Sequence, residues 1–178
     1  MSKRLLAVLL TLLSLSAAVA VADSEGADSV ILISISDIRS GDSSLSNWGQ
    51  VSSGQPDGAA LDVLKEAGFT TVIDIRAAGE DRGMDEATEV AARKMKYISF
   101  PIAAANDISY DNARELDRLL SSTEGPVLVH CASGNRVGAL YALREKLAGA
   151  SDEEALAVGK AAGLTQLEAI VIERFSDE

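Results

Sequence analysis

The sequence has few of the residues that bind metals or form cross-links. Its 178 residues include one cysteine and one histidine. A structural zinc site, a thiolate-held iron–sulfur cluster and a three-histidine catalytic zinc each need more of these ligands. A single cysteine also forms no intramolecular disulfide. We therefore expect neither a metal site nor another cofactor.

Aromatic rings and positive charge are also scarce. The chain has one Trp, three Tyr and three Phe, and 16 basic residues against 27 acidic ones, for a formal net charge of −11. A negative field repels polyphosphate backbones, and few rings are available to stack on bases. Nucleic acid is therefore not an expected partner. The 47% hydrophobic composition instead predicts a domain built around one core.

The first 22 residues have the pattern of a secretory signal peptide. A Lys-Arg pair at positions 3–4 precedes an apolar run, and Ala-Val-Ala motifs at 18–20 and 20–22 offer cleavage sites. The apolar stretch is also close to the minimum that spans a bilayer, but its hydroxyl residues favour cleavage over an uncleaved anchor.

We therefore expect an exported protein, periplasmic or secreted, with no stable membrane insertion after cleavage. The expected organisation is a signal peptide (1–22), an N-terminal arm (23–45) and one domain (46–178). Residues 30–35 form a β-branched run that fits an edge strand of the arm. The sequence gives no indication of oligomeric state.

Beyond the arm, short apolar runs alternate with amphipathic stretches. Strands are expected at residues 69–75, 96–100 and 127–130, and helices at 84–95, at 136–147, after an Asp57 cap and after a Ser109 cap. The run 127–130 is of the kind buried in the middle of a sheet. This alternation predicts an α/β fold with a mostly parallel central sheet flanked by helices.

The C-terminus is predicted to be helical. Ser151 with Glu154, and Thr165 with Glu168, have the spacing of capping boxes. In such a box a hydroxyl and a carboxylate each accept a backbone N–H at the start of a helix. The two boxes indicate two further helices.

The stretch with the clearest chemical content follows the run 127–130. In open α/β sheets, ligands bind beyond the carboxyl ends of the strands, and Cys131 stands at that point. Small or turn-permissive residues follow, whose backbone N–H groups can point inward and bind an anion. These residues are Ala132, Ser133, Gly134 and Asn135. Arg136 then adds a planar fork of donors suited to phosphate or sulfate.

Together these residues describe a nucleophile inside an anion-binding loop. The helix that begins near Arg136 directs its positive dipole end at the loop, which favours a thiolate at Cys131. Alternatively, Cys131 is a small buried hydrophobe and Arg136 a surface charge, but this leaves their shared strand-to-helix turn unexplained. Strand alternation sends His130 to the opposite face, where we expect it to brace the loop rather than act as a base.

The segment HCASGNR at residues 130–136 resembles the signature of cysteine-dependent protein tyrosine and dual-specificity phosphatases, in a shortened form. The resemblance is closer to the phosphatase-like domain of bacterial beta-lactamase-hydrolase-like proteins and covers residues 48–145. The segments that carry it are SGQP at 53–56, AGFTTVIDIR at 67–76, Glu80, YISFP at 97–101 and GPVLVHCASGNR at 125–136. It implies attack of Cys131 on a phosphoryl group held by the loop amides and Arg136, followed by hydrolysis of a phosphocysteine.

Two features depart from that pattern. Four residues separate Cys131 from Arg136, whereas tyrosine phosphatases have five, and the shorter spacing is shared with the sulfur-transferring rhodaneses. A smaller loop has one amide fewer around a tetrahedral phosphate. Val137 replaces the Ser or Thr that commonly follows the arginine and helps the thiolate leave. We therefore expect slow turnover.

A phosphatase also gains from a general acid near the leaving oxygen. The fold implied by the resemblance supplies it from the loop after Pro101, where Asp107 is the first choice and Asp111 the second. The alternative for Asp107 is a plain turn residue. Asp74 and Arg76, with Glu80, are interpreted as a structural network flanking the site.

Three hypotheses follow for this chain. The first is a phosphatase acting on a phosphorylated small molecule or protein, with Cys131 as nucleophile, Arg136 and the loop amides as the phosphate clamp, and Asp107 as acid. The second is a rhodanese-like sulfurtransferase that uses the same cysteine. The third is a catalytically impaired module that binds oxyanions.

Overall fold

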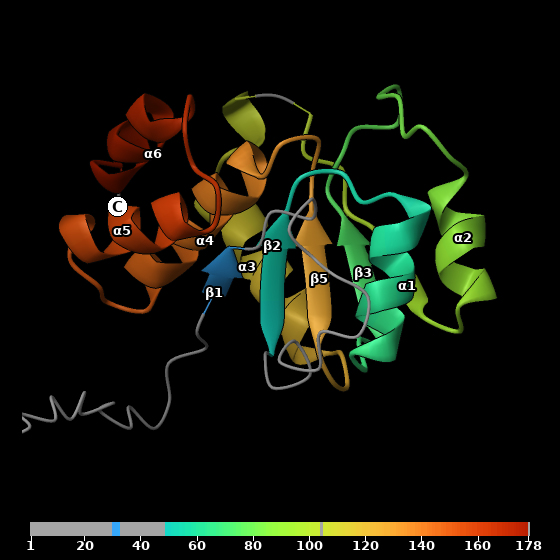
Figure 1. The fold of residues 1–178 in the computed structure, drawn as a ribbon. Coiled ribbons are helices and arrows are strands. Elements are labelled where there is room, and N and C mark those ends of the chain that lie inside the picture. Colours follow the sequence, from blue (N-terminus) through green and yellow to red (C-terminus); the bar gives the residue numbers. More distant parts are fainter. Residues whose placement is uncertain (1–29, 33–48, 104, 178) are drawn as a thin grey trace, which may run out of the picture.

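The structure is a computed structural model that describes residues 30–32, 49–103 and 105–177. Its five strands are all parallel and form one sheet in the order β1-β2-β5-β3-β4. They are β1 (Val30–Leu32), β2 (Gln50–Ser53), β3 (Thr71–Asp74), β4 (Lys96–Ser99) and β5 (Val127–His130). The strand that leads to Cys131 is thus the central one (Figure 1).

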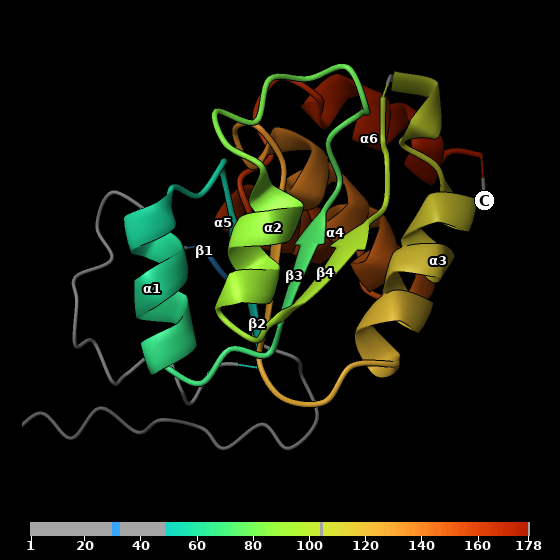
Figure 2. The same cartoon turned by 90° about the vertical axis from the view of Figure 1, so that its right-hand side faces the viewer.

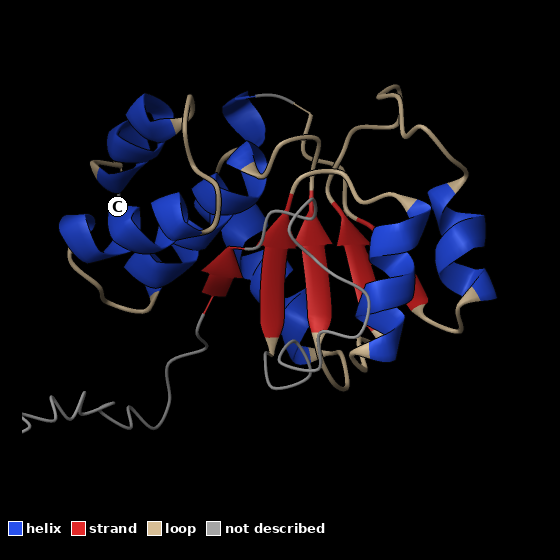
Figure 3. Ribbon diagram, viewed as in Figure 1, coloured by secondary structure: helices blue, strands red, loops and turns tan. Residues whose placement is uncertain are grey.

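Helices cover both faces of this sheet (Figures 2 and 3). They are α1 (Gly58–Glu66), α2 (Glu86–Ala92), η3 (Ala105–Asp107), α3 (Tyr110–Ser121), α4 (Asn135–Leu147), α5 (Asp152–Ala161) and α6 (Glu168–Phe175). One face carries α1 and α2, and the other carries α3 and α4. Helices α5 and α6 pack against α4. The predicted α/β fold, with its parallel sheet and helical C-terminus, is confirmed.

Alternation along β5 divides the core into two clusters. Leu128 packs with the apolar side chains of α1 and α2, whereas Val127 and Val129 pack with those of α3 and α4. All three side chains are buried. The same alternation, continued past the strand, places His130 on the α1–α2 side and Cys131 on the α3–α4 side. The two neighbouring residues therefore lie in different environments.

Local capping signals located most helix starts correctly. The side chain of Asp57 accepts the N–H of Ala60 at the start of α1, and Ser109 accepts that of Asn112 at the start of α3. Ser151 and Glu154 form a complete capping box at α5. These interactions satisfy backbone donors that the first helical turn leaves unpaired.

The predicted capping box of Thr165 and Glu168 is wrong. Helix α6 begins at Glu168 with Leu167 as its N-cap and has no side-chain cap of its own. The N–H groups of Thr165 and Leu167 instead donate to the side-chain oxygen of Asn135. A tertiary contact from α4 therefore replaces the local one.

The N-terminal predictions fall mainly outside the described residues. The signal peptide (1–22) lies there, as does the arm (23–45) apart from Val30–Leu32. Those three residues form β1, which pairs with β2 at one edge of the sheet. Within residues 30–32, 49–103 and 105–177, no helix is both long enough and apolar enough to span a bilayer.

Candidate active site

The loops that follow the parallel strands lie together at the carboxyl ends of these strands, at the top of Figure 1. The connection between β5 and α4 contains residues 131–134. It contacts the end of β2 and the connection after it, because the N–H of Cys131 donates to the carbonyl of Ser53 and the N–H of Gln55 donates to that of Ala132. The loop after β4 also reaches this point, because the carbonyl of Ile102 accepts a hydrogen bond from Arg136.

Cys131 is buried but has a polar neighbour at its sulfur. The residue is 1% exposed and borders the apolar cluster between the sheet and helices α3 and α4. Its Sγ accepts the backbone N–H of Gly134 at 3.1 Å. This directional contact ties the position of the Cys131 side chain to the backbone of Gly134.

The loop that begins at Cys131 has several backbone donors with no protein acceptor. Among the described residues, the N–H groups of Ala132, Ser133, Asn135 and Arg136 donate to no other protein atom. Gly134 makes this conformation possible, since its φ of 86° lies in the left-handed region. Unpaired N–H groups at a helix start form an anion-binding site.

Arg136 is held by a bidentate ion pair. Its Nη1 and Nη2 donate to the two carboxylate oxygens of Glu80 at 2.5 and 2.6 Å, and Nη1 also donates to the carbonyl of Ile102 at 2.8 Å. These contacts use three of the five guanidinium N–H groups. The two that remain, on Nε and Nη2, form one edge of the fork. That edge is the one available to a phosphoryl group.

The charges of this pair reinforce each other. The hydrogen bond to Glu80 raises the pKa of Arg136 above its usual value against the effect of burial, and the nearby Cys131 sulfur adds to this. The Arg136 hydrogen bond is also the main cause that lowers the pKa of Glu80. Both groups are therefore charged over the physiological range. Glu80 was expected in a flanking network, but it binds the guanidinium itself.

Asn135 directs its side chain away from the loop. Its Oδ1 accepts the N–H of Thr165 at 2.8 Å and that of Leu167 at 3.3 Å, both in the connection between α5 and α6. The backbone N–H of Asn135 remains among the free donors of the loop, whereas the amide side chain anchors the loop to the C-terminal helices. The sequence placed Asn135 in the anion loop but gave no indication of this anchor.

Asp107 lies in the loop that reaches Arg136. It ends η3 and is partly buried. Its Oδ2 accepts the N–H of Ala103 at 2.7 Å, and its carbonyl accepts the side-chain amide of Asn112. The carboxylate thus caps a turn. Asp111 forms an exposed ion pair with Arg114 in the first turn of α3, and its carboxylate is 95% exposed.

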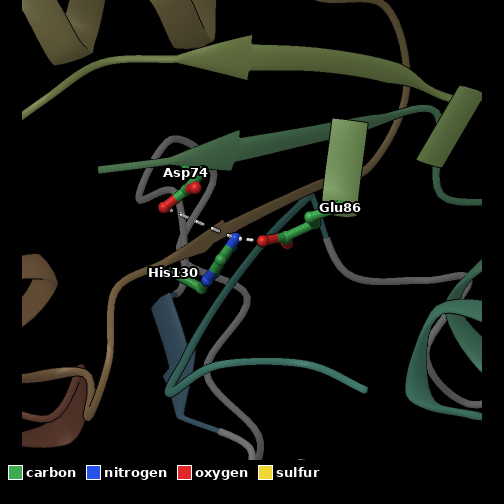
Figure 4. Close-up of side chains that lie close together, drawn as sticks. All are labelled: Asp74, Glu86 and His130. Atoms are coloured by element: carbon green, nitrogen blue, oxygen red, sulfur yellow. Dashed lines mark ion pairs between the residues drawn. The ribbon is translucent and has the colours of Figure 1, made fainter. Parts of the chain in front are cut away.

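On the opposite side of the sheet, His130 belongs to a buried polar cluster. Figure 4 shows its imidazole between two carboxylates, with Nε2 2.8 Å from Glu86 and 4.0 Å from Asp74. Arg76 is fully buried with them, bonding Asp74 from Nε at 2.9 Å and also contacting Glu86. This cluster packs behind the strand that ends at the cysteine.

The carboxylate of Asp74 is the centre of this cluster. Burial opposes its ionisation, but donors from Arg76 and from the Tyr97 hydroxyl hold its pKa well below the usual range. Arg82 donates to the same carboxylate at 2.9 Å. Burial together with the bond to Asp74 raises the pKa of Tyr97 to about 12. The cluster therefore depends on an ionised Asp74.

The donor atoms of Asp74, Glu86 and His130 lie within 4.8 Å of one another, which is compatible with a metal ion. The guanidinium of Arg76 already contacts both carboxylates and supplies the compensating positive charge. A second cation beside it would be repelled. The geometry therefore favours a structural ion-pair cluster, on the face of the sheet opposite Cys131.

Comparison with known proteins places these residues in a family context. Residues 33–170 match the family described as DSP-PTPase phosphatase fused to NAD+ kinase. A beta-lactamase hydrolase-like protein from Xylella fastidiosa is 34% identical over 116 residues, which are 62% of this chain and 27% of that protein. The chain thus spans about a quarter of the length of this curated relative.

Solved structures resemble the fold. A candidate phosphatase from Neisseria meningitidis superposes with a TM-score of 0.63 at 24% identity, covering 72% of this chain and 92% of that one. TpbA from P. aeruginosa, solved in complex with phosphotyrosine, superposes with a TM-score of 0.55 at 20% identity. The match covers 68% of this chain and 75% of the TpbA chain. At these identities the likeness concerns the fold.

Proposed function

The chain belongs to the family described as DSP-PTPase phosphatase fused to NAD+ kinase and is a phosphatase-like hydrolase, and on this premise we propose that it hydrolyses phosphoric monoesters through a phosphocysteine. The observation that carries the proposal is the set of free loop donors around Cys131, joined by one open edge of Arg136. Preorganised donors of this kind stabilise charge that develops on a transferring group. The substrate is a phosphorylated small molecule or protein.

In the first step the Cys131 thiolate attacks phosphorus, and the bond from phosphorus to the ester oxygen breaks. The loop N–H groups and the open edge of Arg136 hold the three equatorial oxygens. The departing oxygen takes a proton from Asp107, whose loop is joined to Arg136 through the carbonyl of Ile102. The products of this step are an alcohol and a phosphocysteine.

In the second step water attacks the phosphocysteine and returns one proton to Asp107. The bond from sulfur to phosphorus breaks, inorganic phosphate is released, and the Cys131 thiolate is regenerated on the protein. Val137 is fully buried in the core beneath the loop and offers no hydroxyl to the departing sulfur. This step is therefore the slower one in the proposed cycle, and the phosphocysteine accumulates.

The first experiment compares wild type with Cys131→Ser in two assays. We expect wild type to hydrolyse p-nitrophenyl phosphate and the variant to lose this activity, because serine lacks the thiolate nucleophile. In the second assay, thiosulfate and cyanide test sulfur transfer with the same pair of proteins. Thiocyanate formation without phosphate release would favour the sulfurtransferase instead.

A third measurement separates an enzyme from a binding module. Inorganic phosphate is titrated into wild type and into Arg136→Lys, which keeps the charge but loses the planar fork. Phosphate binding by wild type without turnover in either assay would support a catalytically impaired oxyanion-binding module and reject the enzymatic proposal.

We further propose that the protein acts outside the cytoplasm, on the basis of the signal-like residues 1–22. The N-terminal residue of protein recovered from the cell envelope tests this. A mature chain that begins after Ala20 or Ala22 supports export, and an intact N-terminus in the cytoplasm contradicts it.

A further inference from the structure

Two segments of the chain contact the loop between β5 and α4. The first is the end of β2 with the connection after it, which bonds to the loop through the carbonyl of Ser53 and the N–H of Gln55. The second is the turn between α5 and α6 (residues 162–167), whose Thr165 is 30 positions along the chain from Asn135. Nothing in the loop sequence predicts this second contact.

The turn between α5 and α6 touches the residue that donates to the cysteine. The backbones of Gly163 and Gly134 are so close that a Cβ placed on Gly163 would lie 3.0 Å from the carbonyl carbon and oxygen of Gly134. The N–H of Gly134 is the one that bonds to Cys131 Sγ. Displacement of the turn would therefore reach the sulfur through a single residue.

The side chain of Asn135 stabilises the same contact between the turn and the loop. Its Oδ1 accepts two N–H groups of the turn, from Thr165 and Leu167, where α6 lacks a side-chain cap of its own. One side chain therefore holds the turn just before α6 and also fixes the residue between Gly134 and Arg136. A loop whose own N–H groups must stay free for a ligand cannot be held by those groups, and it needs support from its side chains and its neighbours.

We propose that Asn135 and Gly163 are positioning residues, through which the turn between α5 and α6 holds the Gly134 N–H on the Cys131 sulfur and keeps the loop donors convergent. The inference rests on the proposed function for its catalytic meaning. The part of the inference that concerns structure, namely that the loop is preorganised to bind an oxyanion, holds whether or not the protein turns over a substrate.

Gly163→Ala tests the backbone contact, and the chain provides a matched control. Gly163 has a φ of 107° and Gly149 a φ of 94°, so alanine is strained at both positions. A Cβ at Gly149 meets nothing within 4 Å, whereas at Gly163 it pushes against Gly134. We expect the strain to lower the melting temperature of both variants by about 2–4 °C, while only Gly163→Ala alters the site.

Asn135→Ala tests the side-chain lock without adding strain. Its control is Ser151→Ala, which removes the hydroxyl that caps α5 through the N–H of Glu154. Both substitutions delete an acceptor for backbone N–H groups at the start of a C-terminal helix. Asn135→Asp keeps an acceptor oxygen in place and is expected to restore part of the loop geometry that Asn135→Ala loses.

Three readouts report on the site separately from stability. They are the affinity for inorganic phosphate, the rate at which iodoacetamide modifies the single cysteine at a fixed neutral pH, and the kinetic constants with p-nitrophenyl phosphate. We expect Gly163→Ala and Asn135→Ala to weaken phosphate binding and to lower kcat/KM by about tenfold or more, since a small misplacement of catalytic donors is costly. We expect Gly149→Ala and Ser151→Ala to match wild type in all three readouts.

The results distinguish this inference from the proposed function. If wild type hydrolyses the ester but Gly163→Ala and Asn135→Ala behave like their controls, the positioning role is wrong and the phosphatase stands. If wild type hydrolyses no ester, yet phosphate protects its cysteine from modification and the two variants lose that protection, the positioning role stands and the phosphatase does not. If wild type shows neither turnover nor protection, both are overturned.

Discussion

At the residue scale, the pair of Glu80 and Arg136 raises the question of whether the carboxylate competes with substrate or serves it. Glu80 occupies the Nη1–Nη2 edge of the guanidinium and Ile102 takes a further N–H, so that the Nε–Nη2 edge remains open. A free arginine side chain samples many rotamers, and ordering it costs entropy. The ion pair removes that cost before phosphate arrives. Glu80 therefore orients the clamp rather than blocking it.

Glu80→Gln should therefore weaken the site. The amide accepts only one guanidinium N–H and turns its own donors toward the other, so we expect kcat/KM for p-nitrophenyl phosphate to fall about 10- to 100-fold. Glu89→Gln is a matched control, because Glu89 pairs with Arg93 at 2.7 Å on α2, away from the loop. Tighter phosphate binding in Glu80→Gln would show that the carboxylate competes with substrate.

Val137 supports a second prediction at this scale. The residue follows Arg136 and is fully buried. Threonine has nearly the same shape and adds the hydroxyl that would assist departure of the sulfur. We expect rapid mixing of wild type with p-nitrophenyl phosphate to show a burst of p-nitrophenol followed by slow turnover. In Val137→Thr we expect a smaller burst and about tenfold faster steady turnover. A wild type without a burst would contradict the slow second step.

At the scale of elements, the loop after β4 supplies both a ligand for Arg136 and the proposed acid. Asp107→Asn is a clean probe, because asparagine can still accept the N–H of Ala103 while losing the proton. We expect turnover of an alkyl phosphate to fall about 100-fold, with a much smaller loss on p-nitrophenyl phosphate, whose leaving group needs no proton. Equal losses on both substrates would reject Asp107 as the acid.

Helix α6 holds this loop as well. Nε of Arg174 donates to the carbonyl of Ile108 at 3.1 Å, next to Asp107. Arg174→Met keeps the aliphatic length but removes the donor. We therefore expect turnover of the alkyl phosphate to fall about threefold to tenfold, with a smaller loss on p-nitrophenyl phosphate. Arg118→Met, on the exposed face of α3, is the control. A change in stability with no dependence on the leaving group would leave Arg174 as a structural contact.

The elements that sequence reasoning located correctly are those with local signals. The caps at Asp57 and Ser109 depend on residues three positions apart, and the apolar run Val127–His130 marks the central strand by itself. Alternation from this strand also places His130 and Cys131 on opposite faces. Physical rules that act over one turn or one strand can be read from a single sequence.

The contacts that could not be predicted join distant parts of the chain. Glu80 is 56 positions from Arg136, and Thr165 is 30 positions from Asn135. Glu86 is almost fully buried although it opens a helix, where a glutamate is ordinarily a surface residue favoured by the dipole. In each case the pairing depends on how helices dock on the sheet, which no local pattern specifies. The error at Thr165 has the same origin.

At the scale of the whole molecule, the buried cluster beneath the sheet links stability to pH. The pKa of Asp74 is depressed in the folded state relative to its ordinary value of 3.8. A depressed carboxyl pKa contributes stability that is fully present above the unfolded value and is lost as pH falls through the folded one. Acidification below about pH 4 should therefore weaken the fold progressively.

Asp74→Asn tests this contribution. The change leaves the buried Arg76 with fewer compensating charges, and breaking a buried ion pair costs about 3–5 kcal/mol. We expect urea unfolding at neutral pH to show a loss of that order, and the remaining stability to depend less on pH in the acid range. Asp62→Asn, which removes an exposed partner of Arg93, should change neither the stability at neutral pH nor its dependence on pH in the acid range. An unchanged acid slope in Asp74→Asn would assign the acid sensitivity to other carboxylates.

The strand order has a consequence for biosynthesis. β5 is hydrogen-bonded on both sides, to β2 and to β3, both of which emerge from the ribosome well before it. Until residues 127–130 are translated, β2 and the β3–β4 pair each present an open edge to which other nascent chains can add. The segment that brings the cysteine into place is thus also the one that closes the sheet, so a ribosome that stalls ahead of it would release an aggregation-prone fragment rather than an inactive domain.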